Sequence, residues 1–311
     1  RSIFYQERME FAAERYKRGA DERVSWIKSI PFILMHLMPF GILWTGFGWT
    51  EAVLCGALYL VRMFFITAGF HRYFAHRAFK TGRLMQFVFA FGGGAAAQKG
   101  VLWWAGHHRH HHKHSDLPSD IHSPKRGFWW SHMGWIVCEK YEVTPSQQIK
   151  DFSKYPELVW LDRWHLVPPV VLALACYFIG GASALFGGFF LSTALVYHGT
   201  FVINSVTHVF GRRRYATTDT SKNSLLLALI TLGEGWHNNH HYYQSTANQG
   251  FFWWEIDISY YVLKLMSWTG LVWDLRTPSK KVMLSNWEKA PVSTLESGAP
   301  AARVSERPAT A

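Results

Sequence analysis

Residues 52–76 read AVLCGALYLVRMFFITAGFHRYFAH. Residues 52–70 are almost wholly apolar, and His71 and His76 follow them directly. A helix needs roughly 20 apolar residues to cross the hydrocarbon core of a bilayer, because each residue adds about 1.5 Å. This stretch therefore predicts a transmembrane helix that brings two histidines to one membrane surface.

Three more stretches have similar length and apolar character: residues 27–49, 166–181 and 184–206. The turns near residues 49–51 and 180–183 lack basic residues, whereas Lys and Arg are frequent before residue 27, between 71 and 165, and after 206. Basic residues accumulate on the cytoplasmic side of membranes. We therefore expect four transmembrane helices in two hairpins, with both termini cytoplasmic.

The expected fold is an all-α integral membrane protein with a cytoplasmic helical cap. Residues 27–286 form the membrane domain, in which 71–165 and 207–286 make the cap. Residues 1–26 are expected to form a basic cytoplasmic helix, and 287–311, rich in Ala, Pro and Ser, a disordered tail. A further apolar stretch, residues 84–104, predicts a helix lying beneath or partly in the membrane.

Composition narrows the class of protein. Aromatic residues make up 17% of the 311 residues, which excludes a disordered chain. Three cysteines are too few for a disulfide-stapled secreted fold or a four-thiolate cluster. The formal charge of +11 suggests an anionic partner, but the basic residues flank membrane helices, which disfavours nucleic acid.

Histidine is the outlier, with 17 residues. Three clusters stand out: His71 and His76, the run HHRHHHKH at 107–114, and HNNHH at 237–241. Helical spacing predicts that the three histidines of the last cluster converge on one point. His71 and His76 are five residues apart, about 140° around an ideal helix, so we expect them to serve two different metal ions. Because imidazole is a good ligand for iron, copper or zinc, the clusters predict a binuclear metal site.

The central run has two possible registers, because both His107/His110/His111 and His108/His111/His112 fit the spacing HxxHH. Isolated histidines are interpreted as ordinary packed or exposed side chains: His36, His122, His132, His165 and His198.

The order HxxxxH, HxxHH, HxxHH resembles the integral-membrane fatty acyl desaturases, particularly the stearoyl-CoA (delta-9) type and its bacterial relatives. Lys113, Ser115 and Asp116 after the second box, and Gly233-Glu234-Gly235-Trp236 before the third, extend the resemblance. It fixes the register and implies nine ligands to two iron ions: His71, His76, His108, His111, His112, His208, His237, His240 and His241. By the same resemblance, Asn204 acts through a bound water.

The resemblance implies an enzyme that uses O2 and two electrons to place a cis double bond, most simply delta-9, in a saturated acyl chain. An acyl-CoA thioester is the first expectation. Animal acyl-CoA members carry Trp-Ala-Arg-Asp where this chain has Trp104-Ala105-Gly106-His107. Further on, they carry two basic residues where this chain has Glu139-Lys140. Acyl lipid and acyl carrier protein therefore remain alternatives.

Electrons must come from a separate protein, because the chain has neither a fused cytochrome b5 signature nor a cysteine cluster. The resemblance implies a ferredoxin, rubredoxin or b5-like donor with its reductase, and a place in the bacterial inner membrane with the active site cytoplasmic.

Candidate substrate contacts follow from position. Met63 lies eight residues before His71, about 12 Å along a helix, so Tyr59 or Met63 is expected to close the acyl tunnel. Trp104, Lys99 and Lys140 complete the candidates, the two lysines as partners of a phosphate-bearing head group. A hydroxylase or acetylenase on the same scaffold is the nearest alternative. A metal transporter or storage protein is disfavoured, because the clustered histidines lie at cytoplasmic ends rather than along a membrane path.

Overall fold

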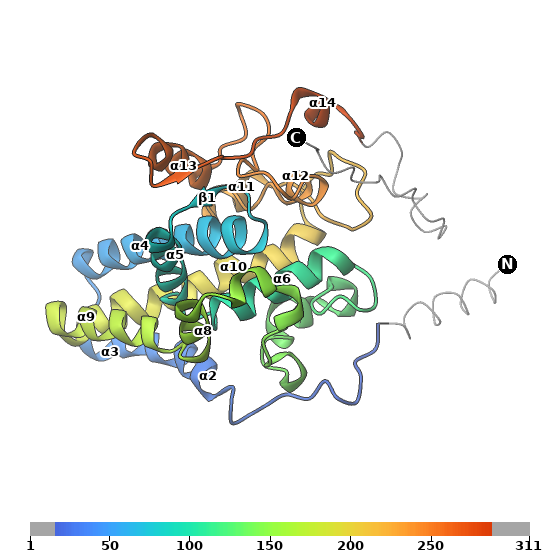
Figure 1. Ribbon diagram of the computed structural model, residues 1–311. Helices are drawn as coiled ribbons and strands as arrows, with labels where there is room; N and C mark the ends of the chain where they lie inside the picture. Colours follow the sequence, from blue (N-terminus) through green and yellow to red (C-terminus); the bar gives the residue numbers. More distant parts are fainter. Residues whose placement is uncertain (1–15, 288–311) are drawn as a thin grey trace.

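The computed structural model describes residues 16–287, and helices dominate it (Figure 1). Residues 52–75 lie in one long helix, in which α4 (Trp49–Phe64) continues without a break into the π-helical segment η2 (Phe65–Ala75), and His76 follows it directly. A second long helical stretch contains α9 (Val167–Ser183), the π-helical η7 (Ala184–Phe190) and α10 (Leu191–Val209). These two stretches are long and apolar enough to cross a membrane.

Within residues 16–287, two helices are therefore long and apolar enough to span a membrane, whereas the sequence predicted four. The first expected span is the shorter apolar helix Ile30–Thr45, made of α2 (Ile30–Leu37), the 3-10 turn η1 (Met38–Gly41) and α3 (Ile42–Thr45). The expected third and fourth spans run together, but Gly181 (φ 67°, ψ −162°) interrupts the helix at the place where the sequence predicts a turn.

The remaining elements are short and lie mainly between or after these helices. They are β1 (Lys80–Thr81), α5 (Arg83–Gly94), α6 (Val101–His114), η3 (Pro124–Arg126), η4 (Trp130–Gly134), η5 (Glu139–Tyr141), η6 (Ser146–Gln148), α7 (Lys150–Ser153), α8 (Pro156–Arg163), α11 (Leu225–Ile230), α12 (His237–Tyr242), α13 (Ile258–Trp268), β2 (Val272–Trp273) and α14 (Lys280–Leu284). The two strands pair antiparallel, with Lys80 opposite Trp273.

Two local expectations were wrong. Residues 84–104 are not one helix, because α5 ends at Gly94 and α6 begins at Val101, with Ala97 and Lys99 between them at φ 58° and 64°. Residues 16–26 form turns and a single bridge instead of a helix. Residues 1–15 of the expected N-terminal helix, and 288–311 of the expected tail, lie outside the described residues.

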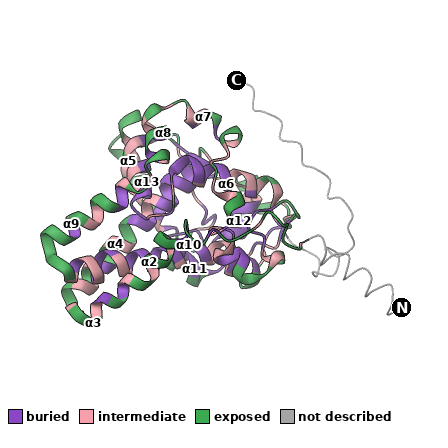
Figure 2. Cartoon of the chain, turned by 90° about the horizontal axis from the view of Figure 1, so that it is seen from below, coloured by how far each residue is buried: buried purple, intermediate pink, exposed green. Residues whose placement is uncertain are grey.

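The helices divide into an apolar, outward-facing part and a buried cap. In Figure 2 the exposed residues are frequent on α9 and α3, whereas α6 and α12 lie where burial is greatest. Large apolar side chains such as Trp44 and Ile179 are 84% and 88% exposed. A surface of this kind is stable only when lipid or another apolar partner covers it. The clustered histidines lie instead on η2, α6, the end of α10 and α12.

The charged side chain within the long helix, Arg62, is buried and hydrogen-bonded to neighbouring elements. It donates to the hydroxyl groups of Ser192 and Thr193 on α10, the latter at 2.6 Å, and to the Ala95 carbonyl at 3.4 Å. Intramembrane charge is costly unless it is paired in this way. Arg62 thus fastens α4 to α10 and to the end of α5.

Candidate metal centre

Four elements present histidines to one point inside the cap. His71 lies within η2 and His76 directly after it, three histidines come from α6, His208 from the end of α10, and three more from α12. The π-helical turn makes the first pair possible. The His76 N–H donates to the His71 carbonyl at 3.1 Å, a contact five residues long.

This turn overturns the expectation that His71 and His76 face different metals. With hydrogen bonds from i+5 to i, residues five apart stack on one face, and the two rings lie 4.8 Å apart. The expectation used 3.6 residues per turn, which does not apply in a π-helical segment.

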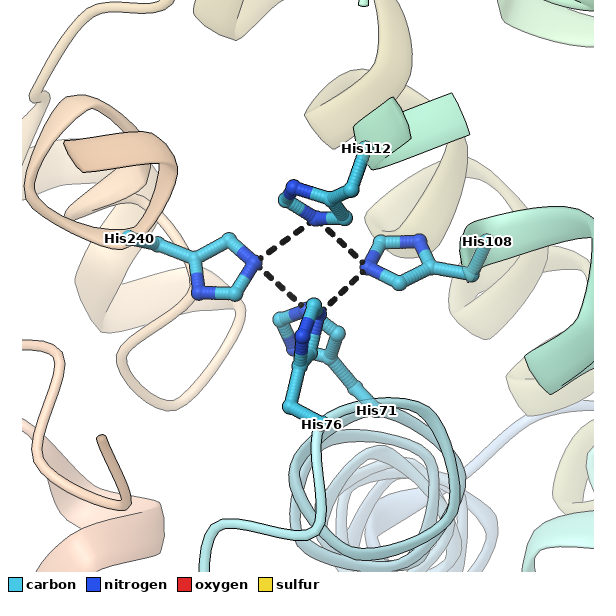
Figure 3. Close-up of side chains that lie close together, drawn as sticks. All are labelled: His71, His76, His108, His112 and His240. Atoms are coloured by element: carbon cyan, nitrogen blue, oxygen red, sulfur yellow. Dashed lines mark hydrogen bonds between the residues drawn. The ribbon is translucent and has the colours of Figure 1, made fainter. Parts of the chain in front are cut away.

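Five histidines, His71, His76, His108, His112 and His240, form group A (Figure 3). Their ligand nitrogens all lie within 4.8 Å of one another. Successive Nε2 atoms are 2.9–3.0 Å apart around the group. Figure 3 shows the rings arriving from different directions with these nitrogens pointing inward.

Four histidines, His111, His208, His237 and His241, form group B. Ligand nitrogens of three of them lie within 4.8 Å of one another, and the His237 Nε2 lies 3.1 Å from that of His208. His237 also lies beside His241, with ring centroids 4.3 Å apart. The two groups adjoin, because the His112 and His241 rings are 4.5 Å apart.

The nine histidines singled out in the sequence are therefore the nine that meet here, but the second and third boxes each divide between the groups. His240 belongs to group A, whereas His237 and His241 belong to group B, so the expected convergence of these three was wrong. Within the other register, His110 Nε2 lies 3.0 Å from the Ser119 carbonyl and His107 packs against Trp103, both away from the two groups.

Buried carboxylates hold the outer nitrogen of several rings. Asp120 accepts from His111 Nδ1 at 2.9 Å, Asp219 from His241 Nδ1 at 2.7 Å, and Glu234 from His71 Nδ1 at 2.5 Å. A carboxylate on Nδ1 fixes the tautomer in which Nε2 carries the free lone pair, as in known metal sites. The inward nitrogens are thus prepared to accept a metal ion.

The Arg72 side chain, which is fully buried, supports this arrangement from behind. It contacts both oxygens of Asp257 at 2.9 and 3.0 Å and one oxygen of Glu234 at 3.1 Å. Glu234 therefore lies between the Arg72 guanidinium and the His71 ring. The motif before the third box points to Glu234, whereas no motif points to Asp120 or Asp219.

Electrostatics favour neutral imidazoles. Burial lowers the pKa of His76, His108, His112, His237 and His240 well below the usual range, and neighbouring histidines lower it further. Neutral imidazole is the form that binds metals, so these five rings are ready to bind without first losing a proton. The pKa of His111 moves the other way, because the Asp120 carboxylate raises it.

The donor set passes a simple fit test for a metal. Two nitrogens, each about 2.1 Å from an ion and at right angles, would be about 3.0 Å apart, close to the Nε2 separations of group A. In addition, the buried His241 Nε2 finds no hydrogen-bond partner among the described residues. A cluster of unpaired imidazole lone pairs this dense is costly unless cations occupy it.

One further histidine, interpreted from the sequence as ordinary, belongs to this neighbourhood. His122 is 3% exposed, stacks on His111 with centroids 4.1 Å apart, and could join Asp120 and His111 in holding an ion. Its place six residues after Asp116 in the same loop was the available signal. Elsewhere, His132 lies 3.0 Å from both the His198 ring and Ser205.

A cavity of about 530 Å³ reaches group A. Its walls come from the start of α2, the turn 95–100, α6, and one face of α10, and His108 and His122 lie in its lining. Apolar and aromatic side chains supply most of the remaining surface, including Phe32, Trp135 and Phe201.

Some of the residues predicted to contact the substrate line this cavity, and the others do not. Trp104 and Lys99 line it, as does Asn204, one turn before His208. Tyr59, Met63 and Lys140 do not. Tyr59 donates to the Ile230 carbonyl at 2.8 Å, and Lys140 pairs with Asp21 at 2.8 Å. Met63 is 1% exposed and packed into the core beside Gly199.

Comparison with known proteins agrees with this geometry. A family model described as fatty acid desaturase matches residues 26–265. The chain is 34% identical to an sn-1 stearoyl-lipid 9-desaturase of Anabaena variabilis, over 83% of this chain and 96% of that one. It is 33% identical to delta-9 acyl-lipid desaturase 1 of Arabidopsis thaliana, over 86% and 92%, and 36% identical to an acyl-CoA C20 delta5-desaturase of Anemone leveillei, over 75% and 76%. The chain therefore belongs to the fatty acid desaturases, a family of O2-dependent oxidoreductases.

Proposed function

We propose that this enzyme places a cis delta-9 double bond in a saturated acyl chain at a di-iron centre held by groups A and B. The observation that carries the proposal is the pair of adjoining groups, five and four imidazoles, with inward Nε2 atoms and carboxylates behind them. The stearoyl-lipid 9-desaturase among the relatives supports the position of the bond.

Group A would hold one iron and group B the other, with Asn204 contributing to group B through a water. Two irons bound here would supply the O2-derived oxidant needed to remove hydrogen from an unactivated methylene, which acid–base side chains alone cannot do. The overall change consumes one O2, two electrons and two protons for each CH2–CH2 converted to CH=CH, and releases two waters.

The chain's own residues orient the metal-binding rings, bind the acyl chain and exclude water from it. Asp120, Asp219 and Glu234 keep Nε2 free on the rings that they contact. The apolar cavity holds the acyl chain with one methylene pair next to His108 and keeps water away from it, which turns an encounter into an oriented contact. Hydroxylation on the same scaffold would add oxygen instead of removing two hydrogens.

The same proposal includes the arrangement in the membrane and the source of electrons. We expect all four apolar segments to lie in the membrane, in two hairpins, with the metal groups on the cytoplasmic side of the bacterial inner membrane. An external ferredoxin, rubredoxin or b5-like protein, with its reductase, supplies the electrons on that side.

Expression in a host with few unsaturated acids tests the function. The parent is expected to produce a new monounsaturated acid, and a His237→Ala/His241→Ala variant is expected to produce none. His110→Ala is the matched control, because this residue lies on α6 but contacts the Ser119 carbonyl, and it should retain the product. A hydroxy acid from the parent, or undiminished product from the double variant, would contradict the proposal.

A further inference from the structure

Lys99 lies in the wall of the cavity in a conformation that costs energy. Its φ of 64° is left-handed, which non-glycine residues adopt only when the surroundings impose it. Here the neighbours impose it, because Tyr197 donates to the Ala97 carbonyl at 2.7 Å and Gln98 donates to Thr200 at 2.9 Å. The turn 95–100 is thus fastened to α10 through the two residues that directly precede Lys99.

The ammonium group of Lys99 has no carboxylate partner among the described residues. It lies 5.1 Å from the centre of the Trp103 ring, and the acidic groups nearest to it are already engaged. Glu142 pairs with Lys28, and Asp162 accepts from the Trp103 N–H at 2.8 Å and from Thr144 at 2.6 Å. Burial lowers the pKa of Lys99, which shows that the charge is held partly away from water.

A half-buried, unpaired and conformationally strained cation is a poor structural element but a good anion site. Lys28 and Lys99 are the lysines of the lining and Glu142 is its carboxylate, so two positive charges and one negative leave a net charge of +1. That charge matches a ligand with a single negative charge next to its acyl chain.

We propose that Lys99 binds the phosphodiester of a membrane glycerophospholipid whose acyl chain fills the cavity. This inference rests on the proposed function and names its substrate class. In such a lipid the phosphate lies only a few bonds beyond the ester, so an ammonium in the cavity wall can reach it while the chain extends toward His108.

Coenzyme A fits the same site less well. Its diphosphate is separated from the thioester by the whole pantetheine arm, and it carries several phosphates. Three other cations near the cavity already have acidic partners: Lys28 pairs with Glu142, Arg126 with Glu22, and Lys140 with Asp21. The exposed apolar side chains before α2, Trp26 at 73% and Ile27 at 81%, further suggest that the cavity opens toward lipid.

The test compares three substrates on the iron-loaded enzyme in nanodiscs with a reducing system: distearoyl phosphatidylglycerol, a distearoyl galactolipid without charge, and stearoyl-CoA. We expect Lys99→Gln to raise KM for the phospholipid about tenfold, the loss expected for one charge-assisted hydrogen bond, with kcat unchanged. KM for the galactolipid should not change. Lys99→Arg should keep the parental KM for the phospholipid. Lys140→Gln, outside the cavity, is the matched control and should also leave this KM unchanged.

Equilibrium binding gives a readout that does not depend on turnover. A diether phosphatidylglycerol, offered without the reducing system so that no turnover occurs, should bind about tenfold more weakly to Lys99→Gln than to the parent. Equal binding to both would overturn the proposal, as would a parent enzyme that uses stearoyl-CoA and no phospholipid. If none of the three substrates yields an unsaturated product while the diether lipid still binds through Lys99, the proposed function fails and the anion site stands.

Discussion

Asp219 provides the sharpest test of how the protein prepares its metal ligands. One carboxylate oxygen accepts from His241 Nδ1 at 2.7 Å, and the other accepts from the Ser221 N–H at 3.0 Å and the Thr217 hydroxyl at 3.0 Å. Burial alone would raise the pKa of Asp219, but the His241 ring, together with His208 and the Ser221 hydroxyl, holds it well below the usual range. The group is therefore an anion that accepts on both oxygens.

Asp219→Asn keeps the shape but provides only one accepting atom. If the amide NH2 faces His241, the ring must accept at Nδ1 and carry its proton on Nε2, which then cannot bind metal. If the amide turns over, the NH2 faces two donors instead. Either arrangement should weaken iron binding at group B by about 10- to 100-fold, or about 1.4–2.7 kcal/mol, the usual cost of losing a partner behind a ligand.

The assay is the iron content of purified protein, measured against increasing chelator. The parent should retain two irons per chain over a range in which Asp219→Asn retains one, because group A has its own support from Glu234. Asp274→Asn is the matched control, since Asp274 is 59% exposed and pairs with Lys80. If the variant is monodisperse and keeps both irons at the parental chelator concentration, the argument about the His241 tautomer is refuted.

Three further predictions follow from the surroundings of the site. Gly233→Ala should destabilise the fold by about 3 kcal/mol or more, because Gly233 has φ 122° and a Cβ there would lie 2.3 Å from Asp257 Oδ1, the partner of Arg72. Denaturant unfolding measures this, and a loss below about 1 kcal/mol would contradict it. Burial, together with the His198 ring, lowers the pKa of His132 to about 4. Since the unfolded value is about 6.5, the folded state binds fewer protons between these values and loses stability as the pH falls from 6.5 toward 4. His132→Asn should therefore show a smaller drop in Tm between pH 7.5 and 5 than the parent, and an equal drop would argue against this linkage. Tyr59→Ala should lower stability by about 1–2 kcal/mol through loss of its bond to Ile230, yet leave chain-length preference unchanged, because Tyr59 lies outside the cavity. A shift to longer substrates would restore Tyr59 as the end of the tunnel.

Much of the site was predictable, because spacing within a box fixes which residues share a helix. Spacing alone left two registers open in the second box; the resemblance to the desaturases selected His108 and added His208, and the structure brings these nine histidines together. How the ligands divide between the two metal groups did not. His71 and His76 share group A because η2 is π-helical, and no local propensity indicated that turn.

Tertiary contacts explain the other differences. The expected helix 84–104 ends at Gly94, because the turn that follows is hydrogen-bonded to α10. Gln98 donates to Thr200 and Ala97 accepts from Tyr197, and each pair is 100 or more residues apart in the chain. The roles of Asp120 and Asp219 likewise depend on loops folding back onto α6 and α12. Arg62, ambiguous in the sequence, has hydroxyl partners that only helix packing brings within reach.

The central claim is that the histidine groups drive removal of two hydrogens from an acyl chain. The most direct test supplies iron-loaded enzyme, an electron donor and ¹⁸O2 to a stearoyl substrate, and analyses the product by mass spectrometry with localisation of the double bond. The account predicts a product two mass units lighter, unsaturated between carbons 9 and 10 and free of ¹⁸O. A product that carries ¹⁸O on the chain would contradict it and make the enzyme a hydroxylase.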